Sequence, residues 1–302
     1  MDNISKLLIL LLLVTGCKSQ PEKQSDNNNL PEPFSPPDIP AVVTDPGQRA
    51  VLLSEAYWKN FNFSDTALIS HPEITEQAFV DFLHVLTRIP PEKAGRAITR
   101  MMRSATADSN MFAHFADLSE KYLYHPNSPL RDEELYVPVL RYVIGLPGLD
   151  ESYKVRPRYQ LEMILKNRPG DVATDFTYTL RDGKQGRLSR IRAAYTLLFF
   201  NNPDCNDCLY TKNFIGQSSV LQHLTDSGKL KVVAVYPDTD LEQWKQAEFP
   251  REWISGYNTT LSKEGLYDLK AIPTLYLLDK DKRVVLKDVS IDQVELYFIQ
   301  NM

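Results

Sequence analysis

Two cysteines separated by two residues are the strongest candidates for chemistry in this 302-residue sequence. They are Cys205 and Cys208, in the run Asp204-Cys205-Asn206-Asp207-Cys208. A spacing of three residues places two side chains on one side of a helical turn, where their sulfurs can form a disulfide. Such pairs carry out thiol–disulfide exchange, in which a thiolate attacks a disulfide and a second thiol resolves the mixed disulfide. We predict Cys205 as the nucleophile, Cys208 as the resolving thiol, and a redox-active Cys205–Cys208 disulfide.

The elements expected around the cysteines place them where this chemistry needs them. Residues 195–200 form a continuous apolar run, which predicts a strand buried on both faces. A helix is expected at about 209–224 and a second buried strand at 230–235. The cysteines then lie where a strand is followed by a helix, and the free N–H groups and dipole at a helix start stabilise a thiolate.

A second motif lies before another predicted strand. The run Ala271-Ile272-Pro273-Thr274 precedes a strand at 274–279, a hairpin turn at 280–282 and a strand at 284–287. Proline is allowed at the start of a strand, where its peptide bond can be cis. Upstream, residues 175–180 alternate like a strand, and Asp182-Gly183 supplies a hairpin turn.

Together these residues resemble the thioredoxin fold, with the cysteine pair and the Ile272-Pro273-Thr274 loop in the expected order. Residues 170–302 look like the TlpA/ResA branch of membrane-tethered thiol–disulfide oxidoreductases. The resemblance implies that Pro273 is cis and faces the cysteines. It also implies that the backbone around Ile272 pairs with a substrate peptide as an added strand.

The sequence departs from the family pattern at three places. Asp204 stands where thioredoxin has Trp, Asn206-Asp207 replaces Gly-Pro, and Phe199 replaces a buried acid, which puts the usual proton-relay partner of Cys208 in doubt. A carboxylate near a thiolate raises the thiol pKa. We therefore expect Asp204 and Asp207 to tune the thiol pKa and keep the couple on the reducing side, with Lys212 as a partial offset. A potential above about −170 mV would contradict a reductase.

Other interpretations of the cysteine pair remain open. A zinc site needs four ligands, and the sequence has neither a second CxxC nor a nearby pair of histidines. A purely structural disulfide would close so short a loop that it would remove little chain entropy. Redox chemistry is the favoured interpretation, and we predict no metal and no bound cofactor.

The N-terminus carries the features of a secretory signal. An apolar run spans residues 7–14 and ends in Val14-Thr15-Gly16-Cys17. These four residues resemble the lipobox of bacterial lipoproteins, which implies lipidation of Cys17; an ordinary signal peptide is the alternative. Residues 18–47 hold seven of the 20 prolines and an Asn27-Asn28-Asn29 run. We predict a signal peptide at 1–17 and a disordered tether at 18–47.

Residues 48–168 have helical periodicity and predict an all-α bundle of five or six short helices. Helices are expected over residues 74–86, after Pro90-Pro91, and at 110–124, 132–145 and 151–166. The aromatic cluster near residues 57–63 is interpreted as core, and Arg96, Arg100 and Arg103 as a solvated helix face. With its Tyr-Trp-x-x-Phe opening, this stretch resembles an uncharacterised helical domain found ahead of thioredoxin modules in lipoproteins of Gram-negative anaerobes.

The expected architecture is therefore a helical bundle followed by an α/β thioredoxin-like domain at 169–302, with a central mixed sheet flanked by helices. A net charge of −5 argues against nucleic-acid binding. We predict a lipid-anchored, periplasm-facing oxidoreductase of the cell envelope that reduces disulfides of envelope proteins and receives electrons from a membrane or periplasmic donor. The alternative is an envelope binding or scaffold lipoprotein whose thioredoxin fold is vestigial.

Overall fold

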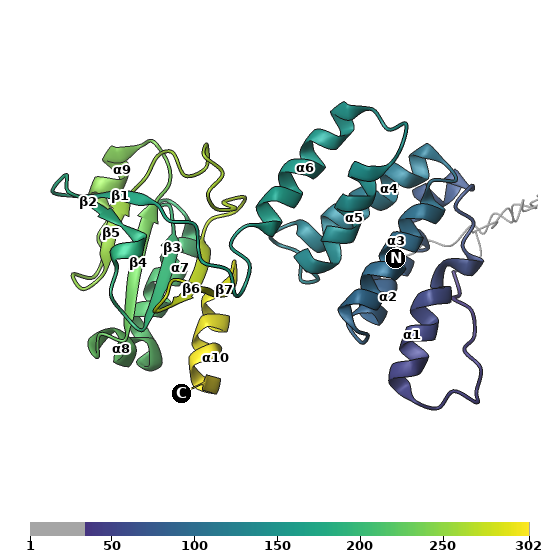
Figure 1. Ribbon diagram of the computed structural model, residues 1–302, viewed down its shortest axis with the longest axis horizontal. Helices are drawn as coiled ribbons and strands as arrows, with labels where there is room; N and C mark the ends of the chain where they lie inside the picture. The colour runs from purple at the N-terminus through teal and green to yellow at the C-terminus, as the bar shows by residue number, and fades with distance from the viewer. Residues whose placement is uncertain (1–33, 302) are drawn as a thin grey trace, which may run out of the picture. The chain divides into compact units, whose positions relative to one another are not determined.

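Aspartate-capped helices build the N-terminal half of the chain in the computed structural model, which describes residues 34–301 (Figure 1). Four helices begin after an aspartate whose side chain accepts backbone N–H groups of the first turn, and α3 begins with Pro91 at its first position. The helices are α1 Pro46–Ala56, α2 Thr75–Leu86, α3 Pro91–Ala105, α4 Ser109–Ser119, α5 Glu133–Gly145 and α6 Glu151–Leu165.

Three short turns complete this helical half. They are 3-10 turns at Tyr57–Asn60 and Thr66–Ser70, and a single π-helical turn at Glu120–Tyr124 that continues α4. The sequence prediction of an all-α bundle is confirmed.

Aromatic side chains form the core of the helical half. Phe115 is fully buried, and its ring lies 5.2 Å from the rings of both Trp58 and Phe63. Tyr57 and Phe61 are also buried in this cluster. The interpretation of the aromatic cluster as core, rather than as a ligand groove, is therefore correct, because these rings bury one another.

A seven-stranded mixed sheet forms the C-terminal half, with strand order β2-β1-β5-β4-β3-β6-β7 (Figure 1). β3 pairs in parallel with β4 and antiparallel with β6. The strands are β1 Thr177–Leu180, β2 Gln185–Arg187, β3 Tyr195–Phe200, β4 Leu230–Tyr236, β5 Ile254–Tyr257, β6 Thr274–Asp279 and β7 Val284–Lys287. The helices are α7 Asn206–Gln217, α8 Ser219–Asp226, α9 Leu241–Gln246 and α10 Ile291–Asn301. The expected thioredoxin-like architecture is confirmed.

Both faces of the sheet are covered, which explains why β3 is apolar at consecutive positions. Leu197 and Phe199 join one hydrophobic core with residues of α7, α8 and α10. Leu198 and Phe200 join a second core on the other face, where Tyr267 packs from a segment without regular secondary structure.

The register between β3 and β6 brings the two sequence motifs together. Phe200, the last residue of β3, lies opposite Thr274, the first residue of β6. The cysteine pair follows Phe200 and Pro273 precedes Thr274, so both motifs lie at the same end of the central strands. The peptide bond between Ile272 and Pro273 is cis, as the family resemblance implies.

The structure differs from the sequence prediction in several elements. The single helix expected at 209–224 is two helices, because Ser218 takes an extended conformation and caps α8 with its side chain. The sequence did not reveal β5, α9 or α10.

The N-terminal end of the described chain also differs from prediction. The ring of Phe34 packs 5.5 Å from that of Tyr57, and α1 begins at Pro46. Residues 34–47 of the stretch predicted as tether are described, and among them Phe34 packs against the aromatic cluster of the helical half. The predicted signal peptide at 1–17, its Cys17 and tether residues 18–33 lie outside the described residues.

Candidate active site

Cys205 is the N-cap residue of α7, the position that chemistry on a thiolate requires. Its backbone is extended, with φ −91° and ψ 119°, and its Sγ accepts the backbone N–H of Cys208 at 3.1 Å. The side chain is partly exposed. This sulfur therefore lies at the N-terminal end of α7, within reach of a backbone N–H group.

Cys208 lies one turn further into the helix and is buried, with 4% of its surface exposed. Its Sγ accepts the backbone N–H of Asn202 at 3.5 Å. Burial, followed by a hydrogen bond with Cys205, raises the pKa of the Cys208 thiol well above its usual range. The two thiols are free, and their environments are unequal: one sulfur is accessible and the other is held protonated.

The cis-proline loop faces the accessible sulfur. The thiol of Cys205 donates to the backbone carbonyl of Ile272 at 3.4 Å. Pro273 follows in the cis conformation, and the buried Thr274 donates its hydroxyl to the carbonyl of Ala271. The structure therefore brings Cys205, Cys208 and the Ile272-Pro273-Thr274 loop together.

The two aspartates of the motif are exposed and lie in different surroundings. Asp204 accepts a hydrogen bond from the side chain of Gln243. Asp207 lies in the first turn of α7, and its charge is a minor contribution to the raised pKa of Cys208. Lys212 points elsewhere, because its Nζ donates to the carbonyl of Glu248 at 3.1 Å. The tuning role expected for Asp204 and Asp207 stays a prediction.

Phe199 occupies the position where the family buries an acid, and it is 1% exposed. It packs in the same core as Cys208, with its ring 6.4 Å from that of Trp253. A carboxylate at this position would be buried among apolar side chains, where a charge is costly.

An exposed apolar pair beside the cysteines escaped the sequence analysis. Leu209 and Tyr210, the two residues after Cys208, are 49% and 56% exposed. The signal was present in the sequence, since two large apolar residues directly follow the motif, but only the structure shows that they do not enter the core.

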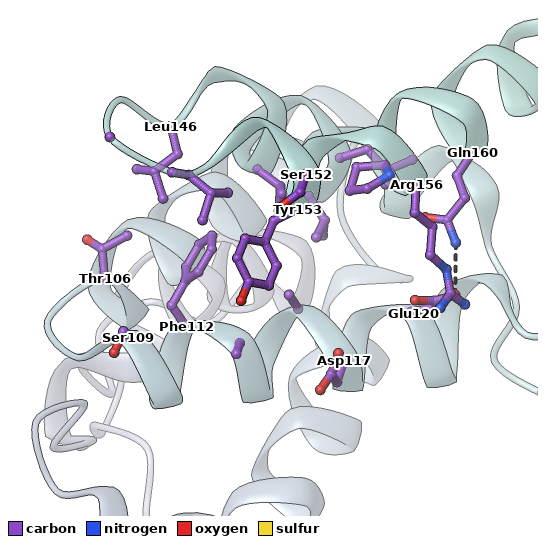
Figure 2. Close-up of a pocket in the computed structure, with 18 of the residues that line it drawn as sticks. Thr106, Ser109, Phe112, Asp117, Glu120, Leu146, Ser152, Tyr153, Arg156 and Gln160 are labelled. Atoms are coloured by element: carbon purple, nitrogen blue, oxygen red, sulfur yellow. Dashed lines mark hydrogen bonds and ion pairs between the residues drawn. The ribbon is translucent and has the colours of Figure 1, made fainter.

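A separate cavity of about 800 Å³ lies in the helical half, between α4, α5 and α6 (Figure 2). Figure 2 shows the rings of Phe112 and Tyr153 pointing into this space. At one end Glu120, the first residue of the π-helical turn, accepts from Arg156 and, at 2.8 Å, from Gln160. A mostly apolar hollow with a few polar groups at one end has the general character of a small-molecule pocket. Sequence reasoning did not find it, since its lining comes from three helices.

Among residues 34–301, no helix has both the length and the apolar content needed to span a bilayer. Over the same range, no three His, Cys, Asp or Glu side chains gather in a way that would hold a metal ion.

Comparisons with known proteins cover both halves of the chain. A family model described as "Domain of unknown function (DUF5106)" matches residues 15–167. The crystal structure of a thioredoxin-like protein from Bacteroides caccae ATCC 43185 is similar over 90% of this chain and 99% of that chain, with 46% sequence identity and a TM-score of 0.85. A comparison with curated proteins finds no match.

Two further solved structures align with less than half of the chain. The C-terminal domain of an uncharacterized protein from Bacteroides fragilis NCTC 9343 is 46% identical over 44% of this chain and 98% of that chain, with a TM-score of 0.43. The thioredoxin domain of a thiol-disulfide oxidoreductase from Bacteroides vulgatus is 20% identical over 43% of this chain and 98% of that chain, with a TM-score of 0.38.

Proposed function

Because the chain belongs to the thioredoxin-like proteins that carry a DUF5106 domain, we propose that it is a thiol–disulfide oxidoreductase. The observation that carries the proposal is the inequality of the two thiols. Cys205 is accessible, caps α7 and contacts the carbonyl of Ile272, whereas Cys208 is buried with a raised pKa. An attacking thiol and a protected resolving thiol need these two environments.

The reaction transfers two electrons from the dithiol to a substrate disulfide. The thiolate of Cys205 attacks one sulfur of the substrate, the substrate S–S bond breaks, and one substrate thiolate leaves. Cys208 then attacks the sulfur of Cys205 in the mixed disulfide, which releases the second substrate thiolate and forms the Cys205–Cys208 disulfide. The two protons of the dithiol end on the two substrate thiols. A donor dithiol must reduce the pair again.

The free edge of the loop suits a peptide substrate. The segment 271–273 belongs to no strand, and its carbonyls accept from the side chains of Cys205 and Thr274 rather than from another strand, so an extended chain could pair with this backbone beside Cys205. The exposed side chains of Leu209 and Tyr210 offer apolar contact next to the sulfur. We propose protein disulfides, in envelope proteins, as the substrate class.

The cellular setting belongs to the same proposal. The Val14-Thr15-Gly16-Cys17 run supports a lipid anchor on Cys17 and a periplasm-facing location. Labelling of the chain in cells with a radioactive fatty acid, and its loss in Cys17→Ser, would test the anchor.

Reduction of insulin disulfides by the chain from residue 18 onward tests the enzyme proposal. We expect the wild-type protein to reduce insulin in the presence of a donor dithiol, and Cys205→Ser to lose this activity. Cys208→Ser should accumulate a mixed disulfide on Cys205, since the resolving thiol is missing. An insulin-reduction rate in Cys205→Ser equal to that of the wild type would contradict the assignment.

The cavity in the helical half favours a second candidate, an envelope binding or scaffold lipoprotein with a vestigial redox site. Its apolar lining and its Glu120–Arg156 end are suited to holding a ligand. Phe199, in place of an acid, is the second argument for this alternative. The insulin assay separates the two candidates, because a scaffold protein would show no reduction that depends on Cys205.

A further inference from the structure

A network of buried charges joins the helical half to the segment that leads into the cis-proline loop. Its acids and bases balance, three of each, and they come in pairs from three separate segments of the chain. The acids are Glu133, Asp268 and Asp288, and the bases are Arg131, Lys270 and Lys287.

Lys270 is the centre of this network. Its Nζ lies 2.8 Å from a carboxylate oxygen of Glu133, 2.7 Å from one of Asp268 and 3.6 Å from one of Asp288. The same ammonium group lies 4.3 Å from the centre of the Tyr124 ring, a cation–π contact. The Lys270 side chain is only 14% exposed, so solvent screens these contacts little.

Glu133 is the helical partner on which two lysines converge. It occupies the first turn of α5, and its second carboxylate oxygen lies 3.1 Å from Nζ of Lys287. Burial by itself would raise the pKa of Glu133, but the charges of Lys270 and Lys287 outweigh it and hold the pKa below its usual range. The buried carboxylate is therefore ionised and fully paired, as a buried charge must be.

The same segment is tied to the helical half at further points. Lys166 donates to the carbonyl of Gly265 at 2.8 Å, and Asn167 donates to that of Leu266 at 2.9 Å. The hydroxyl of Tyr124 donates to Asp268 at 3.2 Å. Residues 258–273 contain no helix or strand. These contacts therefore substitute for the hydrogen bonds that regular structure would supply.

The position of this segment in the chain gives the contacts a consequence for the site. Lys270 lies two positions before Ile272, a span of at most about 7 Å. On the other side of the loop, Thr274 is fixed by its pairing with Phe200. The cis-proline loop is thus held between the central sheet and the helical half.

We infer that the helical half serves to hold the cis-proline loop. Glu133 and Tyr124 are positioning residues: through Lys270 and Asp268 they keep the carbonyl of Ile272 at the sulfur of Cys205. This inference rests on the proposed function, since the loop is the surface on which a protein disulfide would pair.

Glu133→Gln in the full chain tests the inference, with insulin and the small aromatic disulfide DTNB as substrates. Insulin must pair with the cis-proline loop, whereas DTNB needs access only to the sulfur of Cys205. We therefore expect kcat/KM for insulin to fall about tenfold, mainly through KM, with the DTNB rate unchanged. Backbone amides of residues 265–272 should exchange with deuterium faster. Tyr124→Phe, which keeps the ring and removes only the hydroxyl, should shift the same quantities in the same direction.

Glu134→Gln is the matched control, because Glu134 is the next residue of α5 and pairs with Arg168 at an exposed position. It should leave both substrates and the exchange rates unchanged. Equal losses with insulin and DTNB in Glu133→Gln would mean general destabilisation, and unchanged insulin kinetics and exchange in both variants would overturn the inference. A wild-type chain that reduces neither substrate would refute the proposed function, while the exchange rates would still decide whether the helical half holds the loop.

Discussion

At the scale of single residues, the site depends on a difference between two chemically identical side chains. Cys205 and Cys208 are one helical turn apart, yet one caps the helix and the other is buried among apolar residues. Burial disfavours the thiolate of Cys208 and raises its pKa. The order of reaction in the proposed mechanism follows from that difference, because only the accessible thiol can meet a substrate.

Alkylation of the reduced protein tests this difference. We expect iodoacetamide at pH 7 to modify Cys205 and to leave Cys208 unmodified. Cys208 stays in its thiol form, and the thiolate is the form that reacts. Modification of Cys208 should remain slow as the pH rises past about 8.5, the usual value for a cysteine. Peptide mass spectrometry at several times and pH values would measure both rates.

Cys205→Ser provides the control for this experiment. It replaces the thiol of Cys205 with a hydroxyl and leaves the burial of Cys208, which is the largest cause of the raised pKa. Cys208 should stay unreactive at pH 7 in the variant. Alkylation of Cys208 at the rate of a free thiol would show that burial does not protect it.

The raised pKa of Cys208 also makes the stability of the reduced protein depend on pH. Above about pH 8.5 the unfolded chain releases this proton while the folded chain retains it. Ionisation then favours the unfolded state, so the reduced protein should lose stability as the pH rises through this range.

At the scale of elements, the register of β3 against β6 assembles the site. Pairing of Phe200 with Thr274 brings a turn that carries the cysteines next to a loop about 70 residues further along the chain. Both strands are buried apolar runs, and their sequence therefore predicted them. The break between α7 and α8 was not predicted, because it lies at one residue, Ser218, whose side chain caps α8.

Ser218→Ala should destabilise the junction of α7 and α8. The Ser218 hydroxyl accepts the N–H of Leu221 at 3.1 Å and donates to Glu295 of α10. Loss of an N-cap typically costs about 1 kcal/mol. Urea unfolding followed by circular dichroism would measure the change.

The control for this prediction is Ser262→Ala, at an exposed position. It should change the free energy of unfolding by less than about 0.5 kcal/mol. A Ser218→Ala variant as stable as the wild type would mean that the cap contributes nothing and that the helices are separated by packing alone.

At the scale of the whole molecule, buried polar contacts connect the helical half with the thioredoxin-like half. Lys287 at the end of β7 donates to the carbonyl of Ile164 at 2.7 Å and contacts that of Met163 at 3.4 Å, both at the C-terminus of α6. It also pairs with Glu133. One lysine thus satisfies the exposed carbonyl end of a helix and a buried carboxylate.

Lys287→Met should lower the free energy of unfolding by about 3 kcal/mol, because removal of one partner leaves a buried carboxylate short of a charge. The Lys287 side chain is 7% exposed, so screening by water is small. Chemical denaturation of the full chain would measure the loss.

Lys184→Met is the comparison, since Lys184 is 80% exposed and pairs with Asp182 on the surface. Surface pairs of this kind contribute little to stability, because water screens them, so Lys184→Met should leave the free energy of unfolding nearly unchanged. If Lys184→Met and Lys287→Met lowered the free energy of unfolding equally, the buried contacts of Lys287 would stabilise the protein no more than a surface ion pair does.

The sequence by itself determined the elements whose signal is local. The apolar runs of β3, β4 and β6, the helical periodicity of residues 75–165 and the CxxC spacing predicted the fold and the two candidate thiols. β5 gave no such signal. Its Gly256 fits because β1 approaches so closely that an added Cβ would lie 2.8 Å from the Tyr178 ring, a constraint that arises only when the sheet forms.

Tertiary structure alone decided where the cavity lies and how the loop is held. Glu133, Lys270 and Lys287 look like ordinary surface charges in the sequence. They meet only because the helical half and the sheet pack together, which removes water from around them. The free energy of a buried charge is set by the partners that folding brings to it, and no local pattern of residues encodes those partners.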